Sequence, residues 1–160
     1  MIVVVNSSPL IALSRIKKLT LLKTLFNEIQ IPSAVYEEVV IQGRGRCGTN
    51  EIESAKWIKT KEIKNKSHVN YLLETLDEGE AEVLILAEEL NADWAIIDEP
   101  KARISAVLIG LKVIGTVGII LLAKELCVIK NVKHILDSLR KNNFRISDNI
   151  CKWALHEAGE

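Results

Sequence analysis

Acidic residues follow several positions where parallel strands are expected to end. Asp98 and Glu99 come directly after an apolar run, and Glu80 lies in the first turn of a predicted helix. In an open α/β sheet, ligands bind outside the carboxyl ends of the strands. Carboxylates gathered there repel one another unless a cation lies between them, and their oxygen atoms suit Mg²⁺ or Mn²⁺. The first predicted strand, residues 2–5, ends instead at Asn6, whose side chain is a neutral amide.

Glu80 lies on the apolar stripe of its predicted helix. Its neighbours at +3, +4 and +7 are Val83, Leu84 and Ala87, and Asp77 precedes it by about one turn on the same face. A carboxylate on a core-facing stripe is costly unless it is paired or binds a metal. The alternative is that Asp77 and Glu80 only cap the N-terminus of the helix.

The other helical carboxylates are less well defined by their spacing. Glu37 and Glu38 follow Pro32 in a predicted helix, and periodicity does not separate them. Glu78 and Glu82 are offset from the apolar stripe that contains Glu80, so both are expected to be solvated.

Basic and hydroxyl residues accompany the predicted strand ends. Lys101 and Arg103 lie in the first turn of a helix, where their charge opposes the helix dipole. Contact with a nucleic-acid phosphate explains this placement, as do ion pairs with nearby carboxylates. Ser7, Ser8 and Thr116 are expected either to contact the same substrate or to cap the helices that follow them.

Residues 43–50 contain three glycines in the spacing G-x-G-x-x-G. A dinucleotide-binding fingerprint must follow a strand and open a helix, whereas this stretch follows a helix and opens no clear element. We therefore interpret it as a surface loop. The functional alternative is a basic loop whose Arg44 and Arg46 contact phosphates.

The composition limits the class of protein. The 160 residues are 48% hydrophobic and carry no net charge, so any contact with nucleic acid must come from a local basic patch. The three cysteines, at 47, 127 and 151, form no C-x-x-C pair, which favours free thiols in a reducing, cytoplasmic compartment. Neither a signal peptide nor a membrane span is predicted.

Strand and helix signals alternate along the chain, which predicts one α/β domain, residues 1–160, with a mostly parallel sheet. The predicted strands are residues 2–5, 28–31, 57–63, 93–97, 111–114 and 144–146. The predicted helices are residues 8–16, 19–26, 32–41, 76–91, 100–109, 116–126, 132–141 and 147–158.

The closing Phe144-Arg145-Ile146-Ser147 and Glu157-Ala158-Gly159-Glu160 resemble a branch of prokaryotic PIN-domain proteins similar to VapC toxins. Five motifs that precede them, in this order, resemble those of PIN-domain proteins. They are Asn6-Ser7-Ser8-Pro9-Leu10-Ile11, Pro32-Ser33-Ala34-Val35-Tyr36-Glu37-Glu38-Val39, Leu76-Asp77-Glu78-Gly79-Glu80-Ala81-Glu82, Ile97-Asp98-Glu99-Pro100-Lys101-Ala102-Arg103 and Gly115-Thr116-Val117-Gly118. The resemblance implies a three-layer α/β/α fold and metal-dependent hydrolysis of RNA phosphodiesters.

The resemblance also assigns roles to individual residues. The catalytic positions are Asn6, Glu38, Glu80 and Asp98 or Glu99, and the last four carboxylates are the ligands expected for Mg or Mn. Such a cation neutralises the scissile phosphate and lowers the pKa of a bound water. The family has an Asp where this chain has Asn6, and an amide offers a hard cation one neutral oxygen in place of a charged carboxylate.

Three hypotheses follow. The first is a ribonuclease that forms the toxin of a toxin–antitoxin pair, with RNA, an antitoxin protein and a second copy of the chain as partners. The second is a PIN scaffold, weakened by Asn6, that binds RNA or a partner protein without cleavage. The third is a small-molecule phosphohydrolase with a closed pocket in place of an open groove. The apolar residues 106–109 and 117–122 are expected to lie either in a dimer surface or in the core.

Overall fold

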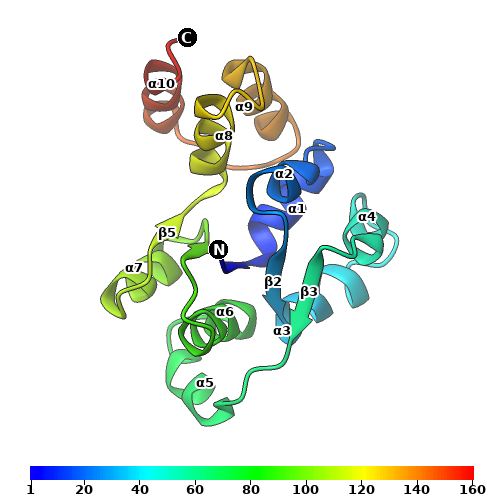
Figure 1. Ribbon diagram of the computed structural model, residues 1–160, viewed down its shortest axis with the longest axis vertical. Coiled ribbons are helices and arrows are strands. Elements are labelled where there is room, and N and C mark those ends of the chain that lie inside the picture. The colour runs from blue at the N-terminus through cyan, green and yellow to red at the C-terminus, as the bar shows by residue number, and fades with distance from the viewer.

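The chain folds around one parallel sheet of five strands. The computed structural model describes residues 1–160, and its strands are β1 (Val3–Val5), β2 (Ile29–Pro32), β3 (Ile58–Lys61), β4 (Trp94–Ile96) and β5 (Val113–Ile114). Their order is β3-β2-β1-β4-β5, and every neighbouring pair is parallel. Figure 1 shows β2 and β3 on one side of the N-terminus and β5 on the other, with β1 at the centre of the sheet.

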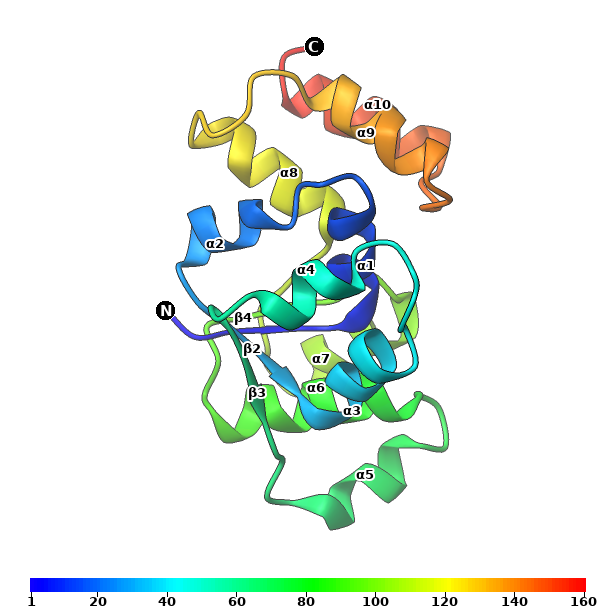
Figure 2. The same ribbon diagram turned by 90° about the vertical axis from the view of Figure 1, so that its right-hand side faces the viewer.

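Helices cover both faces of the sheet. They are α1 (Ser7–Arg15), α2 (Thr20–Phe26), α3 (Ser33–Tyr36) with its π-helical continuation η1 (Glu37–Ile41), α4 (Thr49–Ser54), α5 (Lys66–Leu72), α6 (Glu78–Glu89), α7 (Pro100–Leu108), α8 (Thr116–Glu125), α9 (Val132–Lys141) and α10 (Asp148–Glu157). Figure 2 shows α3 and α6 on one face, and α1, α2 and α8 on the other. This arrangement confirms the predicted three-layer α/β/α fold.

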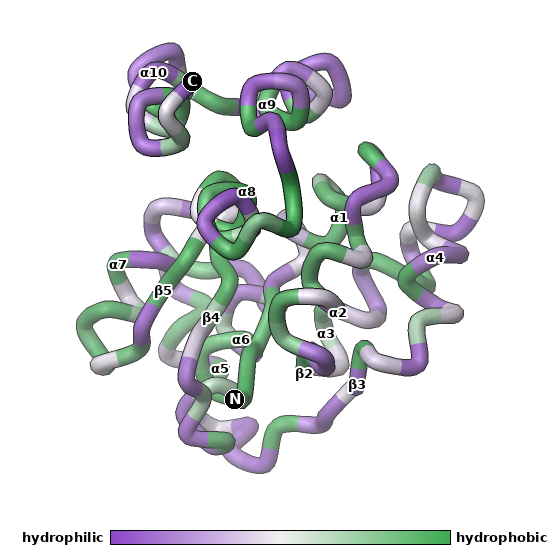
Figure 3. The backbone as a smooth tube through the Cα atoms, turned by 45° about the horizontal axis from the view of Figure 1, so that its top comes forward, coloured by the Kyte–Doolittle hydropathy of each residue, from purple (hydrophilic) through white to green (hydrophobic).

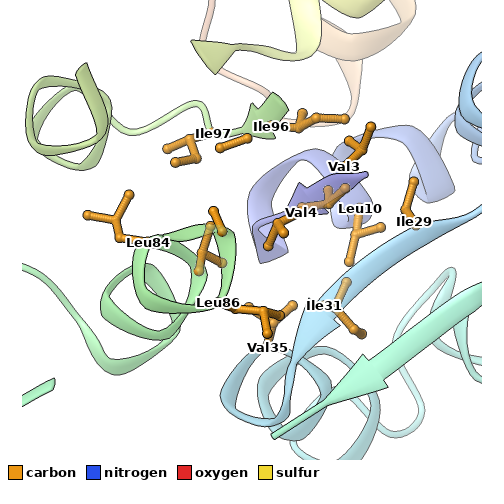
Figure 4. Packing of buried hydrophobic residues seen from close by; sticks show 14 of the residues in the cluster. Val3, Val4, Leu10, Ile29, Ile31, Val35, Leu84, Leu86, Ile96 and Ile97 are labelled. Carbon is orange, nitrogen blue, oxygen red and sulfur yellow. The ribbon is translucent and has the colours of Figure 1, made fainter. Parts of the chain in front are cut away.

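The main core lies between these layers and includes the central strands. All three residues of β1 are fully buried, as expected for a parallel strand with helices on both faces. Figure 4 shows Val4 of β1 and Ile31 of β2 close to Leu86 of α6, with Leu10 of α1 on the other side. The hydrophobic burial of these strands fixes where each one ends, and therefore where the polar residues after it lie.

A second, smaller core joins the three C-terminal helices to α1. Ile120 of α8, Leu136 of α9 and Ala154 of α10 are buried together with Ala12 of α1. Figure 3 shows hydrophilic stretches along α9 and α10 between the hydrophobic ones. The segment between α9 and α10 is thereby held near the carboxyl end of the sheet.

Three predictions about elements are wrong. Residues 144–146 form no strand, because Phe144 closes the end of α9 by donating its N–H to the carbonyl of Leu139 (3.0 Å), and the chain then crosses to α10. α4 and α5 were not predicted; α5 buries none of its residues completely, and its Val69 and Leu72 are only partly buried against the main core. The glycine-rich segment does precede a helix, α4, but it follows η1 and not a strand, so the dinucleotide interpretation still fails.

Two broader expectations concern the environment of the chain. All three cysteines are free thiols. None of the helices has the length and apolar character needed to span a membrane.

Candidate active site

The carboxyl ends of β1 and β4 form a topological switch point. The chain leaves β1 through α1 on one face of the sheet, whereas it leaves β4 through α7, which packs beside α6 on the other face. Neighbouring strands whose connections diverge in this way leave a crevice outside their ends, where ligands bind in open α/β sheets. Asn6 and Asp98 follow these two strands, and the N–H of Asn6 extends the pairing to the carbonyl of Ile96 (3.0 Å).

Asn6 is buried and serves as the N-cap of α1. Its exposed fraction is 2%, and its Oδ1 accepts a hydrogen bond from the N–H of Ser7 (2.8 Å). The hydroxyl of Ser7 also lies 3.5 Å from the same oxygen, and Ser7 itself is buried. The amide oxygen that replaces the family's carboxylate is therefore already occupied by the start of α1.

Asp98 is held by the beginning of α8. Its two carboxylate oxygens accept from the N–H of Thr116 (2.7 Å) and from the hydroxyl of Thr116 (2.6 Å). Gly115 makes room for this pair, because a Cβ there would lie 3.0 Å from Asp98 Oδ1 and 2.9 Å from Arg103 Nη1. Arg103 in turn donates to the carbonyl of Ile97 (2.8 Å) at the end of the strand.

Burial dominates the electrostatics of Asp98. It raises the pKa of the Asp98 carboxyl above its ordinary value, although the two hydrogen bonds from Thr116 and the charge of Arg103 act in the opposite direction. The neighbouring carboxylate of Glu99 raises the pKa further. Asp98 is thus fixed in position by its donors but still disfavoured as an anion.

Glu80 combines a capping role with proximity to other carboxylates. Its N–H donates to Asp77 Oδ1 (2.7 Å), and its Oε2 accepts from the N–H of Asp77 (3.0 Å), which completes a capping box at the start of α6. Burial raises the pKa of the Glu80 carboxyl, the hydrogen bond from Asp77 lowers it, and the charges of Asp77, Glu99 and Glu38 raise it. Carboxylates from η1, from the start of α6 and from the end of β4 therefore approach one another.

Glu38 reaches this cluster from the π-helical turn. Its side chain is exposed, and its Oε2 lies 3.3 Å from the position that a Cβ would occupy at Gly79. The absence of a side chain at Gly79 lets the Glu38 carboxylate lie against the first turn of α6, where the macrodipole favours negative charge. Single π-helical turns occur frequently at functional sites.

Two of the flanking glutamates have different environments. Glu78 is exposed, as predicted. The prediction that Glu82 is solvated is wrong: it is half-buried, and its Oε2 accepts from the N–H of Ala34 (2.9 Å) at the start of α3. Glu82 therefore ties α6 to the helix that leads to Glu38.

A family model described as a PIN domain matches residues 2–160. The chain belongs to the PIN-domain family. Members of this family are generally nucleases that use divalent metal ions. No match is found among proteins of curated function. The resemblance seen in the sequence is thereby confirmed at the level of the PIN domain.

The PIN-domain carboxylates suit a divalent cation in charge and donor type. None of Glu38, Glu80, Asp98 and Glu99 forms an ion pair with a lysine or arginine, although the charge of Arg103 acts on Asp98 from a greater distance. Hard oxygen donors of this kind are the ligands that Mg²⁺ and Mn²⁺ prefer. In the arrangement described here, no three of them lie close enough together to share one cation.

Two clefts flank α1 of the PIN domain and reach the carboxylates. The larger has a volume of about 780 Å³ and is lined by Ser8, Arg15, Asp98 and Glu99, among others. The smaller, of about 50 Å³, is lined by Arg15 and Glu38 together with Arg46 and neighbouring residues. Arg15 therefore faces both clefts from the last turn of α1.

The residues predicted to bind substrate are divided between the surface and the interior. Ser8 lines the large cleft, and Lys101 is exposed at the start of α7. Ser7 and Thr116 are buried, and Arg103 is half-buried against the end of β4. These last three hold other parts of the site in place.

Arg15 and Arg145 line the large cleft but were not singled out from the sequence. A signal for Arg15 exists, because Ser8, Ile11 and Arg15 are spaced by three and four residues and share one face of α1. Spacing gives no such signal for Arg145, which lies in the segment wrongly predicted as a strand and belongs to a motif that carries the family resemblance.

Proposed function

We propose that this PIN domain is a metal-dependent ribonuclease with Glu38, Glu80, Asp98 and Glu99 at its catalytic centre. The observation that carries the proposal is positional. These carboxylates come from three elements near the switch point of a parallel sheet, act on one another electrostatically and form no ion pair with a lysine or arginine. A phosphodiester is an anion, so a cluster of anions can act on it only with a cation in between.

The proposed roles follow from the environment of each residue. A bound Mg or Mn ion supplies charge neutralisation at the phosphate and lowers the pKa of a bound water. Glu38, whose side chain is exposed, and Glu80 would hold the ion together with Asp98 once their side chains move closer together, and Glu99 would add charge at the rim. Thr116 and Arg103 keep Asp98 in place, while Ser8 and Lys101 contact the RNA.

Cleavage of a stem–loop RNA in Mn²⁺ tests the proposal. Glu80→Gln keeps an oxygen that can accept from Asp77 and so preserves the capping box, while it removes the charge. We expect cleavage to fall by about 100-fold or more, because a charged ligand contributes several kcal/mol to the transition state. Glu78→Gln removes an exposed charge from the same helical turn and serves as the matched control. Equal rates for the two variants would refute the assignment of Glu80.

A second candidate function, binding of RNA without cleavage, is favoured by Asn6. Its oxygen already caps α1, so the cation has one charged ligand fewer than the family pattern provides. Asn6→Asp keeps the capping acceptor and adds the missing charge. Calorimetric titration with Mn²⁺ separates the two functions: stoichiometric binding by the parent chain supports the nuclease, whereas binding that appears only in Asn6→Asp supports the scaffold.

The biological setting proposed is a cytoplasmic toxin–antitoxin pair, supported by the resemblance to VapC-like proteins. Expression of the parent chain alone is expected to arrest growth, whereas expression of Asp98→Asn is not. A homodimer is supported by α7, on which Val107 and Leu108 are 64% and 80% exposed. Residues 117–122 contribute less to such a surface, because Ile119 and Ile120 are fully buried. Sedimentation of the parent and of Leu108→Asp tests the dimer.

A further inference from the structure

A second groove continues the large cleft beyond Asp98. It has a volume of about 640 Å³, and its walls come from α7 and α10, which lie on opposite sides of β5 in Figure 1. Both hollows are lined by Asp98, Pro100, Phe144, Arg145 and Ile150. A chain molecule that lies over the carboxylates can therefore extend into this groove without leaving the surface.

The second groove is apolar and contains exposed aromatic surface. Trp153 of α10 and Ile104 of α7 both line it, and they are 52% and 62% exposed. The chain has only two phenylalanines and three tryptophans, and one of each, Phe144 and Trp153, lines this groove. Contiguous exposed apolar surface of this kind marks a binding site.

Arg145 lies on the wall that the two hollows share. Its side chain is exposed, makes no hydrogen bond and has no carboxylate within ion-pair distance. Arg140, a few residues earlier, is instead paired with Asp148 (2.8 Å). An unpaired guanidinium between an acidic cleft and an apolar groove is suited to a phosphate whose sugar carries a base into that groove.

We infer that the groove of Phe144, Arg145 and Trp153 binds an unstacked nucleotide of single-stranded RNA, one that neighbours the phosphate at the carboxylates. Arg145 contacts the backbone phosphate and Trp153 stacks on the base. A base inside a helix is not accessible to such a groove, whereas the bases of loops and ends can turn out and stack on aromatic side chains. The lining has two guanidinium groups, of Arg145 and of Arg103, and Arg103 donates to the carbonyl of Ile97. Few other polar groups line the groove, so recognition is by stacking and tolerates different bases. The inference rests on the proposed ribonuclease function and specifies its substrate.

The charge and continuity of the groove favour RNA over a protein partner. Its apolar part adjoins two unpaired arginines, Arg145 and Arg15, at the large cleft. A second copy of the chain, with no net charge, needs neither of them. Binding of a second copy or of a partner helix is the alternative that the experiment must detect.

The test measures binding of a fluorescein-labelled single-stranded RNA ten-mer of mixed sequence by anisotropy. The full chain carries Asp98→Asn in every sample, so that binding is scored without cleavage. We expect Trp153→Leu to weaken binding about tenfold, the low end for a base stacked on an aromatic ring. Trp153→Phe should recover most of the affinity, and Arg145→Gln should weaken binding and reduce its dependence on salt. Lys152→Gln, which removes an exposed charge beside Trp153 outside the groove, is the control.

Three results would overturn the inference. They are equal affinities for Trp153→Leu and Trp153→Phe, equal affinities for the ten-mer and its duplex, and a Trp153→Leu variant that changes oligomeric state on sedimentation while it binds RNA unchanged. Circular dichroism of each variant identifies loss of folding. If Trp153→Leu is unfolded, the test is tryptophan fluorescence: RNA should quench it in the Asp98→Asn parent, and this quenching should be absent from Trp153→Phe. Base stacking at Trp153 without any cleavage by the native chain would refute the proposed ribonuclease function but support the inferred nucleotide-binding groove.

Discussion

Glu80 and Glu160 are both carboxylates near the N-terminus of a helix, yet their pKa values move in opposite directions. Two backbone N–H groups, of Val132 and Lys133, donate to Glu160, and Lys124 donates to it as well (3.0 Å). These donors lower the pKa of Glu160 to about 2. Glu80 accepts one backbone hydrogen bond and lies near three other carboxylates, and its pKa is raised.

The difference separates a structural carboxylate from one suited to chemistry. At Glu160 the protein itself supplies every donor that the anion needs, so nothing remains for a ligand. At Glu80, and at Asp98 in spite of Thr116 and Arg103, burial and neighbouring carboxylates outweigh the stabilising contacts and leave the pKa raised. Carboxylates whose pKa values are raised and that lie near other carboxylates are candidates for function, because an external cation or proton relieves the cost.

The largest expected effect is on cleavage. Asp98→Asn removes the charge but keeps an oxygen that accepts a hydrogen bond from the N–H of Thr116. The NH2 group of the new amide can donate to the hydroxyl of Thr116. We expect the cleavage rate in Mn²⁺ to fall by about 100-fold or more, whereas Glu160→Gln should leave it within about twofold. The comparison of the two regions fails if both substitutions reduce cleavage alike.

Thr116 should have an intermediate effect. Thr116→Val removes the hydroxyl donor to Asp98 but not the backbone donor, and leaves a largely buried carboxylate oxygen unpaired, at a cost of about 1–3 kcal/mol. Loss of the donor raises the pKa of Asp98 further, so the acid limb of the pH–rate profile should move to higher pH. Thr116→Ser keeps the hydroxyl and should retain the parent profile. An unchanged limb in Thr116→Val would mean that Asp98 does not control it.

The sheet was predictable because its strands are apolar runs that end in polar residues. Val3–Val5 and Trp94–Ile96 were found within one or two residues for this reason, and so were the strand-end positions of Asn6 and Asp98. Their meeting was not predictable from periodicity, because it depends on β1 and β4 being neighbours in the sheet. Only the resemblance to the family brought Glu38 into the same site before the structure did.

Other parts of the site depend on contacts that sequence spacing does not encode. The bond between Asp98 and Thr116 joins residues 18 positions apart, and the bond from Ala34 to Glu82 spans 48. Residues 144–146 are predicted as a strand, yet Phe144 closes the end of α9 through its hydrogen bond to Leu139 and the segment joins no strand of the sheet. The two long-range hydrogen bonds depend on the fold and not on local spacing.

The smallest expected effect is on the pH dependence of stability, measured as the midpoint of thermal unfolding in EDTA. The pKa of Glu160 is lower in the folded chain than in the unfolded chain, so the unfolded chain binds more protons at pH values between the two. The stability that Glu160 contributes is therefore fully present above its pKa in the unfolded chain, near 4.5, and is lost as the pH falls through its pKa in the folded chain, about 2. Glu160→Gln should remove this acid-side loss and lower the midpoint at neutral pH.

Glu80 should show the opposite sign. The pKa of Glu80 is raised in the folded chain, so the folded chain binds more protons than the unfolded chain. Stability is therefore highest below the pKa in the unfolded chain and declines as the pH rises through the pKa in the folded chain. Glu80→Gln should remove that decline and raise the midpoint near neutral pH by no more than about 2 °C, since the carboxyl is only partly buried. Adding Mn²⁺ should stabilise the parent but not Glu80→Gln, because a ligand that binds only the folded state adds to its stability. If Glu80→Gln and Glu160→Gln shift the midpoint in the same direction, the two carboxylates make the same kind of contribution to stability. The proposal that Glu80 is suited to bind a cation then loses its support.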